Sequence, residues 1–240
     1  MDRKYAQYLL KKTQEDYNLI AEDYTRTREF IPEDLNYLGK YTKEGEKILD
    51  SGCGNGRFYE VLEEKNVDFY GVDFSARLIN IARNKYPEGK FQVADALNLP
   101  LPENFFDKVY SISVLHHLPS KEFQIQYLEE IKRVLKPKGL LILRIWDFWK
   151  RKEGWKLFFK YTFLKLVGKS RLGFFDVFMP WKDSGGKIII QRYFHCFKKK
   201  EIENLIQKTG FRIKESWRAG KDPRTNIYIV AEKQNFAPIA

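Results

Sequence analysis

The segment K-I-L-D-S-G-C-G-N-G-R-F, residues 47–58, decides the fold class because an apolar run ending in Asp50 passes directly into three glycines. These glycines, Gly52, Gly54 and Gly56, occupy alternate positions. Glycines this close together permit a sharp backbone turn and let a bound molecule approach the main chain, since no Cβ stands in the way. The segment therefore predicts a strand, a turn that lies against a ligand, and a helix.

Strands and helices alternate on both sides of this turn. Apolar runs predict strands, and apolar residues at spacings of three and four predict helices. The predicted strands are 47–50, 67–75, 89–96, 105–118 and 140–146, and the predicted helices are 56–64, 77–85 and 122–135, the last ended by Pro137 and Gly139. This alternation builds right-handed crossovers and a mostly parallel sheet with helices on both faces, which is an α/β fold.

The regular alternation stops after Trp146. A stretch rich in aromatic residues and lysine follows. One helix pattern (198–210) and two strand patterns (211–217 and 226–233) come after it, and they predict a C-terminal antiparallel hairpin and a sheet of seven strands. We interpret the chain as a single domain, with a helical cap over the sheet edge at its N-terminus. Its predicted parts are the cap (1–40), a ligand-binding core (46–147), a basic aromatic insertion (148–191) and a C-terminal helix and hairpin (192–240).

The charge of the chain is strongly basic and unevenly placed. Lys and Arg number 43 against 32 Asp and Glu, a net charge of +11, and residues 147–200 alone hold 14 basic and 4 acidic residues. This excess favours a polyanionic partner, either a nucleic acid or an anionic membrane surface. The alternative is that a basic surface only keeps the protein soluble.

Other features of the composition exclude several classes of protein. No apolar run reaches the ~18 residues of a spanning helix, and the N-terminal region is charged throughout, so we expect neither a transmembrane segment nor a signal peptide. Cys53 and Cys196 lie far apart, which argues against a disulfide framework and against a metal site. A cytoplasmic protein with reduced thiols is expected.

The ligand of the glycine turn follows from the spacing of its residues. Asp73 ends the second predicted strand, 23 residues after Asp50, where a carboxylate can accept hydrogen bonds from ribose hydroxyls. The order D-x-G-x-G-x-G lacks the G-x-G-x-x-G spacing that seats a pyrophosphate on a helix N-terminus. An adenosyl ligand without phosphate fits this pattern, and S-adenosylmethionine also carries an ammonium and a sulfonium group for nearby anions.

Four motifs in order resemble the class I methyltransferases, whose Rossmann-like fold matches the predicted sheet. They are I-L-D-S-G-C-G-N-G, Y-G-V-D-F-S, the V-A-D-A segment with the strand after it, and R-V-L-K-P-K-G-L-L-I-L. The resemblance implies S-adenosylmethionine as cofactor and S-adenosylhomocysteine as product. The cofactor-binding residues that it implies are Asp50, Gly52, Gly54, Asn55, Asp73, Phe74, Asp95, Ala96, Ile112 and Ser113. A noncatalytic relative of the same fold is disfavoured because every cofactor position is filled.

A narrower resemblance concerns the substrate. The segments Y-N-L-I-A-E-D-Y-T-R-T-R-E-F, S-V-L-H-H-L and R-Y-F-H-C-F, with Arg224, Asn226 and Tyr228, are similar to the tRNA methyltransferases that esterify 5-carboxymethyluridine at the wobble position, a family that also occurs fused to an AlkB-like dioxygenase. The chain departs from that family where Ile227 replaces a Trp, and it lacks the family's Trp after the Thr-Arg pair. The resemblance implies tRNA as partner and allows for a small activating protein subunit.

A carboxylate acceptor would need little acid–base help. Its pKa near 4 leaves it ionised at neutral pH, so no general base is required, and an arginine fork suits the task of holding it. The predicted catalytic residues are Arg28, Arg144, Arg192 and His116. Two alternatives stay open: Arg28 could form a surface ion pair with Asp23 or Glu29, and the buried histidines, His195 included, could only bond backbone or core groups.

The basic insertion allows three interpretations. Its lysines could neutralise RNA phosphates while Trp149, Trp155 or Phe159 stack on unpaired bases. It could instead lie on a membrane surface as an interfacial helix, which would suit a small-molecule methyltransferase acting on a lipid or quinone precursor. A docking surface for a protein partner is the third interpretation. A small carboxylic acid remains the nearest chemical alternative as methyl acceptor.

Overall fold

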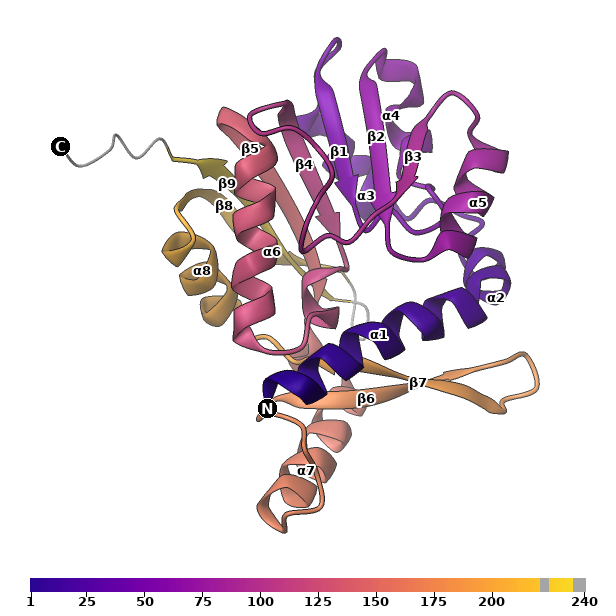
Figure 1. Ribbon diagram of the computed structural model, residues 1–240, viewed down its shortest axis with the longest axis vertical. Helices are drawn as coiled ribbons and strands as arrows, with labels where there is room; N and C mark the ends of the chain where they lie inside the picture. Colours follow the sequence, from indigo (N-terminus) through magenta and orange to yellow (C-terminus); the bar gives the residue numbers. More distant parts are fainter. Residues whose placement is uncertain (221–224, 235–240) are drawn as a thin grey trace, which may run out of the picture.

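The computed structural model describes residues 1–220 and 225–234, and a seven-stranded sheet dominates it (Figure 1). The spatial order of the strands is β3–β2–β1–β4–β5–β9–β8. Their bounds are β1 (Lys47–Ser51), β2 (Asp68–Asp73), β3 (Lys90–Val93), β4 (Phe106–Ile112), β5 (Leu135–Trp146), β8 (Phe211–Ala219) and β9 (Asn226–Lys233).

The first five strands run parallel to one another, and the C-terminal pair closes the sheet as an antiparallel hairpin. In the registers, Asp50 of β1 lies opposite Gly71 of β2 and Tyr110 of β4. Strand β9 runs antiparallel to both β5 and β8. The predicted seven-stranded, mostly parallel sheet with a C-terminal hairpin is confirmed.

Helices cover both faces of this sheet. On one face α6 (Lys121–Val134) and α8 (Lys199–Lys208) pack their apolar sides into the larger core, and on the other face lie α3 (Glu33–Leu38), α4 (Tyr59–Leu62) and α5 (Ala76–Lys85). Short 3-10 turns join these elements: η1 (Gly39–Tyr41), η2 (Glu63–Lys65) and η3 (Leu115–His117). Because the apolar spacing in α5 and α6 is helical, each presents one continuous buried stripe to the strands.

Several element boundaries differ from the prediction. The predicted strand 105–118 ends as β4 at Ile112, since Ser113 has a φ of 65° and the η3 turn follows. Helix α4 begins only at Tyr59, since Gly56 has a φ of 76° and cannot belong to a right-handed helix. Helix α6 ends at Val134 and β5 begins at the next residue, so Pro137 lies inside the strand instead of terminating the helix.

The N-terminal cap consists of two helices, α1 (Arg3–Leu19) and α2 (Ala21–Arg26). Asp2 caps the first of them by accepting a hydrogen bond from the Tyr5 backbone N–H at 2.9 Å. Figure 1 shows α1 lying across one end of the strands rather than along a lateral strand of the sheet. This is the end at which parallel α/β sheets bind ligands.

The insertion after β5 forms a small layer of its own. It comprises η4 (Phe148–Lys150), α7 (Lys152–Leu166) and a separate two-stranded sheet of β6 (Asp176–Lys182) and β7 (Ile188–His195). The predicted boundary between residues 191 and 192 falls inside β7. Within residues 1–220 and 225–234, no helix is both long and apolar enough to span a bilayer.

Candidate active site

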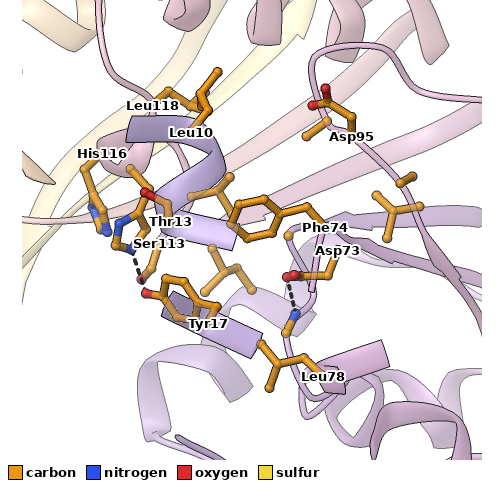
Figure 2. A pocket seen from close by; sticks show the side chains of 18 of the residues that line it. Leu10, Thr13, Tyr17, Asp73, Phe74, Leu78, Asp95, Ser113, His116 and Leu118 are labelled. Atoms are coloured by element: carbon orange, nitrogen blue, oxygen red, sulfur yellow. Dashed lines mark hydrogen bonds between the residues drawn. The ribbon is translucent and has the colours of Figure 1, made fainter. Parts of the chain in front are cut away.

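A cavity lies at the carboxyl ends of β1, β2 and β4, beneath α1 (Figure 2). The glycine turn, the ends of these strands and the η3 turn form its walls, and Tyr17 of α1 closes it. Figure 2 shows Asp73, Phe74 and Asp95 on one side of this cavity and Ser113 and His116 on the other.

Both glycines of the turn that line the first cavity have left-handed backbone conformations, which favour glycine. Gly52 has a φ of 81°, and a Cβ there would stand 2.2 Å from a Val114 methyl group. Gly54 has a φ of 58°, and its α-carbon faces the ring of Tyr24, whose hydroxyl would lie 3.4 Å from a Cβ. The turn therefore leaves backbone exposed to the cavity, as a closely approaching ligand requires.

Asp73 joins the end of β2 to the glycine turn. Its Oδ2 accepts a hydrogen bond from the Gly54 N–H at 2.9 Å, and its Oδ1 accepts one from the Ser75 N–H at 2.9 Å. Burial raises the pKa of Asp73 to about 6 despite these bonds. The carboxylate fixes the turn and lines the cavity, where ribose hydroxyls would find an acceptor.

Asp50, at the end of β1, holds an unsatisfied buried oxygen. The residue is 2% exposed, and its Oδ1 has no hydrogen-bond partner among the described residues. Burial, together with the neighbouring Asp73, raises the pKa of Asp50 to about 8. A buried carboxylate of this kind fits a ligand that brings a cationic group, because such a group would satisfy the free oxygen and favour the ionised form.

The remaining predicted cofactor residues also reach the cavities. Phe74, Asp95 and Ala96 line the first cavity, and Asp95 Oδ1 accepts a hydrogen bond from the Leu97 N–H at 2.9 Å. Ser113 follows the end of β4 with a φ of 65°, which is unusual for a non-glycine residue. This left-handed conformation turns the chain away from the strand direction exactly where the two cavities meet.

A second cavity adjoins the first, and Asp50 is one of the residues that line it. Five residues line both cavities: Tyr24, Gly52, Ile112, Ser113 and Trp146. Other residues line the second cavity but not the first, among them Asp50, Asn55, Arg28, Arg57 and Arg144. The arrangement suits an extended ligand with its nucleoside in the first cavity and an amino acid end in the second.

The structure brings two of the predicted arginines to this second cavity. Arg144 donates to Asp34 Oδ2 at 2.6 Å through Nε and to Ser113 Oγ at 2.9 Å through Nη1. Arg28 lies with its guanidinium 3.7 Å from the ring centre of Tyr24 and 5.3 Å from that of Trp181. Among the described residues Arg28 forms no ion pair with Asp23 or Glu29, and Asp23 pairs with Arg26 and accepts from Trp181.

Arg57 is a cavity residue that the sequence reasoning missed. It follows the last glycine of the turn and lines the second cavity, and burial, with Arg28 and Arg144 nearby, lowers its pKa. No hydrogen bond or ion pair joins its guanidinium to the part of the chain that the structure describes. The only sequence signal was its place directly after G-x-G-x-G, where an exposed helix residue is equally expected.

His116 and His117 play different roles at the other end of the first cavity. His117 Nδ1 lies 3.0 Å from the Tyr193 carbonyl oxygen, so Nδ1 donates and Nε2 accepts from the Tyr17 hydroxyl at 2.9 Å. Burial lowers the pKa of His117 to about 3, which keeps it neutral. His116 is fully buried, lines the cavity, and has no partner at either ring nitrogen within the described residues.

Arg192 of β7 lies next to this end of the site without lining either cavity. It is 5% exposed, its guanidinium carbon lies 4.7 Å from the ring centre of Trp181 and 5.9 Å from that of Trp146, and its Nε has no described partner. Thus both His116 and Arg192 lie near Trp146, His116 with two unsatisfied ring nitrogens and Arg192 with an unsatisfied Nε. Arg224, named in the narrower resemblance, lies outside the described residues.

Comparison with known proteins defines the class. The family profile described as "Methyltransferase domain" matches residues 49–143. A "Putative methyltransferase" of Encephalitozoon cuniculi is 30% identical over 78% of this chain and 77% of its own length. A Methanosarcina mazei S-adenosylmethionine-dependent methyltransferase of known structure superimposes with a TM-score of 0.70 at 22% identity, over 82% of this chain and 97% of that one. The chain belongs to the class I S-adenosylmethionine-dependent methyltransferases.

More specific names occur among its relatives. A Schizosaccharomyces pombe protein named "tRNA (carboxymethyluridine(34)-5-O)-methyltransferase" is 29% identical over 90% of this chain and 94% of its own length. An Arabidopsis thaliana protein of the same name is 37% identical over 54% of this chain, but the match spans only 31% of that relative. A Haloferax volcanii methyltransferase solved in complex with the Trm112 activator superimposes at a TM-score of 0.61 and 17% identity, covering 91% of this chain and 98% of that chain.

The residues present fit S-adenosylmethionine. The glycine turn has room for close approach, Asp73 offers an acceptor for the ribose, and the unsatisfied Asp50 oxygen matches an ammonium group. When bound, the cofactor supplies a methyl group on a sulfonium. The assignment of individual residues to its parts remains a prediction.

Proposed function

We propose that this enzyme transfers the methyl group to the carboxylate of a 5-carboxymethyluridine at the wobble position of tRNA. The names of its Schizosaccharomyces pombe and Arabidopsis thaliana relatives support this substrate. The observation that carries the proposal is the buried pair of unsatisfied groups beside Trp146. The Nε of Arg192 and both ring nitrogens of His116 have no partner among the described residues.

Unsatisfied buried nitrogens of this kind call for a polar ligand. A buried N–H without a partner costs about 1–3 kcal/mol, and more when it is charged, so a ligand that supplies an acceptor gains that amount. Arg192 carries a permanent charge that a carboxylate would neutralise. A modified uridine would offer such a carboxylate to Arg192 and carbonyl or N–H groups to His116.

We then expect the three predicted arginines to have different roles in the site. Arg144 already uses Nε and Nη1 for Asp34 and Ser113, so it supports the turn at Ser113 rather than gripping a substrate. Arg28 stacks on Tyr24 and Trp181 at the cavity wall. Arg192 remains the best candidate for holding the acceptor carboxylate. One oxygen should stay free for attack, since a full bidentate grip would stabilise the ground state.

The chemistry asks for alignment more than for acid–base catalysis. An ionised carboxylate needs no general base, and His116, whose pKa burial lowers, would act as a neutral hydrogen-bonding group. Burial of the site by α1 and the insertion would remove water from the acceptor oxygen. Proximity and orientation of this kind are worth about 7–11 kcal/mol in well-aligned reactions.

A small activating subunit and a cytoplasmic location complete the proposal. The Haloferax volcanii methyltransferase of similar fold was solved with a Trm112 activator, which motivates testing such a partner for this chain. Co-expression with a Trm112-type protein should raise the yield of folded enzyme and its turnover. Equal yield and turnover in its absence would remove the partner from the proposal.

The substrate is tested by the alkali lability of the product. Radiolabelled cofactor should transfer label to tRNA that carries 5-carboxymethyluridine but not to the same tRNA with unmodified uridine. Mild alkali should then release the label as methanol, because esters hydrolyse while methyl groups on nitrogen or carbon stay. Label confined to a lipid extract or to small carboxylic acids, or label stable to alkali, would overturn the proposal.

Variants of Arg192 test the carboxylate-holding role. Arg192→Lys keeps the charge but loses the planar fork, and we expect its turnover to fall about tenfold or more. Binding of S-adenosylhomocysteine by calorimetry serves as the check that the variant is folded. Wild-type turnover in this variant, with cofactor binding intact, would show that Arg192 does not hold the acceptor.

A further inference from the structure

A second concave surface lies on the insertion, outside the two cavities of the active site. It runs between η4, the start of α7 and the start of α8. We call it the α7–α8 cleft, and its lining residues are Trp149, Trp155, Phe158, Phe175, Lys198, Lys199, Lys200, Glu203 and Arg218. None of these residues lines the cofactor cavity or the cavity beside it.

The aromatic walls of the α7–α8 cleft are fixed in place. Trp149 donates its indole N–H to the Phe197 carbonyl at 3.0 Å, and Trp155 donates to the Trp149 carbonyl at 3.0 Å. Phe175 stacks on Phe158 with ring centres 5.5 Å apart and planes 12° apart. Phe175 also has a φ of 68°, an outlier for a bulky residue that the surrounding packing must hold. Because their polar atoms are satisfied, the indoles offer only their ring surfaces.

One of these rings is available for stacking. Trp155 is 42% exposed, and Phe159, one turn further along α7, stacks beside it with ring centres 5.9 Å apart and is 62% exposed. Aromatic platforms of two rings are the usual means by which proteins bind unpaired bases without regard to sequence.

The charge of the cleft is positive after its internal pairs are counted. Four cationic side chains and one carboxylate line it. Glu203 pairs with Lys199 and accepts from Ser216, and Arg218 pairs with the buried Asp147 at 2.7 Å. Lys198 is exposed with its Nζ 4.9 Å from the ring centre of Phe175, and Lys200 is exposed at the cleft edge. Glu201 interacts electrostatically with Lys198, but neither Lys198 nor Lys200 forms an ion pair among the described residues, so both ammonium groups can meet phosphates beside the aromatic walls.

We infer that the α7–α8 cleft binds an unpaired nucleotide of the RNA substrate, with its base on the aromatic walls and its phosphate at Lys198 and Lys200. This inference rests on the proposed function for the identity of the RNA. A nucleotide combines a flat ring with an adjacent anion, and the cleft combines flat rings with adjacent cations. These cations line a concavity, which suits a single nucleotide better than a flat lipid surface.

The α7–α8 cleft is also connected to the active site by a short segment of the protein chain. Trp146, which borders both cavities, is only three residues before Trp149 in the sequence. A loop of RNA that presents one base to the acceptor site would carry neighbouring bases along the insertion. Contact there would hold the anticodon region independently of the methylated base.

Binding of RNA without any methyl transfer tests the cleft. The wild-type enzyme should bind tRNA and a short single-stranded RNA with quenching of tryptophan fluorescence. Trp155→Ala should weaken binding about tenfold, whereas Trp155→Phe, which keeps an aromatic face, should stay within about threefold. In the double variant Lys198→Gln and Lys200→Gln, the slope of log affinity against log salt should fall by about 1.4, the value for two phosphates of a single strand.

The matched control is the double variant Lys43→Gln and Lys65→Gln. Both lysines precede strands at the opposite end of the sheet, and the charge change is the same. Its affinity and salt slope should equal those of the wild type. Unchanged RNA binding in the cleft variants overturns the inference, as does a loss confined to anionic phospholipid vesicles or to a protein partner.

The outcome separates this inference from the proposed function. If the cleft variants lose RNA affinity but the wild type forms no alkali-labile product, only the substrate assignment fails. If the wild type forms the ester and the cleft variants bind and methylate tRNA equally well, only the cleft assignment fails.

Discussion

Arg144 Nε lies 2.6 Å from Asp34 Oδ2, joining β5 to α3, a helix that precedes the first strand in the sequence. The same Asp34 oxygen accepts a hydrogen bond from the Tyr228 hydroxyl at 2.7 Å. Arg144 also donates a hydrogen bond to Ser113 Oγ through Nη1. A carboxylate of α3 thereby fixes the arginine that supports Ser113, where the two cavities meet. Helix α3 therefore contributes to the architecture of the active site as well as to the core.

Replacement of Asp34 by Ala should show this coupling. The variant leaves the mostly buried Arg144 without its anion and Tyr228 without its acceptor. Removing one partner of a buried pair costs about 3–5 kcal/mol, and the partial exposure of Asp34 reduces our expectation to about 2 kcal/mol in the free energy of urea unfolding. Glu122→Ala, which breaks the exposed pair with Arg3, should change it by less than about 0.5 kcal/mol. Equal effects of the two variants would contradict the coupling.

Arg57 should recognise the amino acid end of the cofactor. Its guanidinium is in the second cavity beside Asp50 and has no partner among the described residues, so a ligand carboxylate would supply one. We expect Arg57→Ala to weaken S-adenosylhomocysteine about tenfold or more but to leave 5′-methylthioadenosine, which lacks the amino acid, within about twofold. Calorimetry with both ligands measures the ratio.

Arg28→Ala is the matched control for Arg57, since both arginines line the same cavity. The affinity ratio of the two ligands should change less in this control. A larger change with Arg28→Ala would transfer the carboxylate contact to Arg28. Equal weakening of both ligands by Arg57→Ala would indicate that Arg57 only supports the fold of the glycine turn.

The sheet could be predicted from sequence because its signals are local. Each apolar run and each glycine or proline near its end mark one element, and their alternation dictates the parallel order. The predicted strand 226–233 matches β9 residue for residue. The start of α4 could not be predicted in this way, because the conformation of Gly56, and not the apolar spacing, sets it.

The cofactor side of the site could be predicted for the same reason, and the acceptor side only in part. Asp50, Asp73 and Asp95 follow strand ends, and parallel strands bring their ends together. The partners of the arginines depend instead on packing between distant segments, as with Asp34 and Arg144, which are 110 residues apart. No spacing rule connects the helices that precede the sheet with its fifth strand, so the sequence alone points to neither Asp34 nor Tyr17.

Cofactor binding should release a proton from the Asp50 carboxyl group. Burial and Asp73 raise the pKa of Asp50 to about 8, so the free enzyme holds this proton at neutral pH, whereas an ammonium group beside Asp50 favours the carboxylate. Affinity for S-adenosylhomocysteine should therefore rise between about pH 7 and about pH 8, by up to about tenfold per pH unit. This window lies above the pKa of about 6 for Asp73 and so isolates Asp50.

Calorimetry in buffers of different ionisation enthalpy counts the released proton directly. The wild type should release close to one proton at neutral pH, and Asp50→Asn should release none and show a flat affinity across the same range. A proton count that does not change in Asp50→Asn would place the titrating group elsewhere.

His195 should make the stability of the insertion depend on alkaline pH. Its Nδ1 lies 2.7 Å from Asp176 Oδ1 and its Nε2 lies 3.0 Å from Glu201 Oε1, linking β6 to α8. Burial opposes the charged form, but the two acidic partners outweigh burial and raise the pKa of His195 from its ordinary value of about 6.5 to about 9. Because the folded-state pKa exceeds the unfolded one, the protonated histidine stabilises the fold fully below about pH 6.5, and this contribution is lost as the pH rises through about 9. The shift corresponds to about 3 kcal/mol at most, and urea unfolding from pH 6 to pH 10 should reveal the decline.

His195→Gln should remove most of this pH dependence, whereas His117→Gln should retain it, since burial lowers the pKa of His117 to about 3 and keeps that ring neutral throughout the range. An equally steep decline in His195→Gln would assign the alkaline transition to another group.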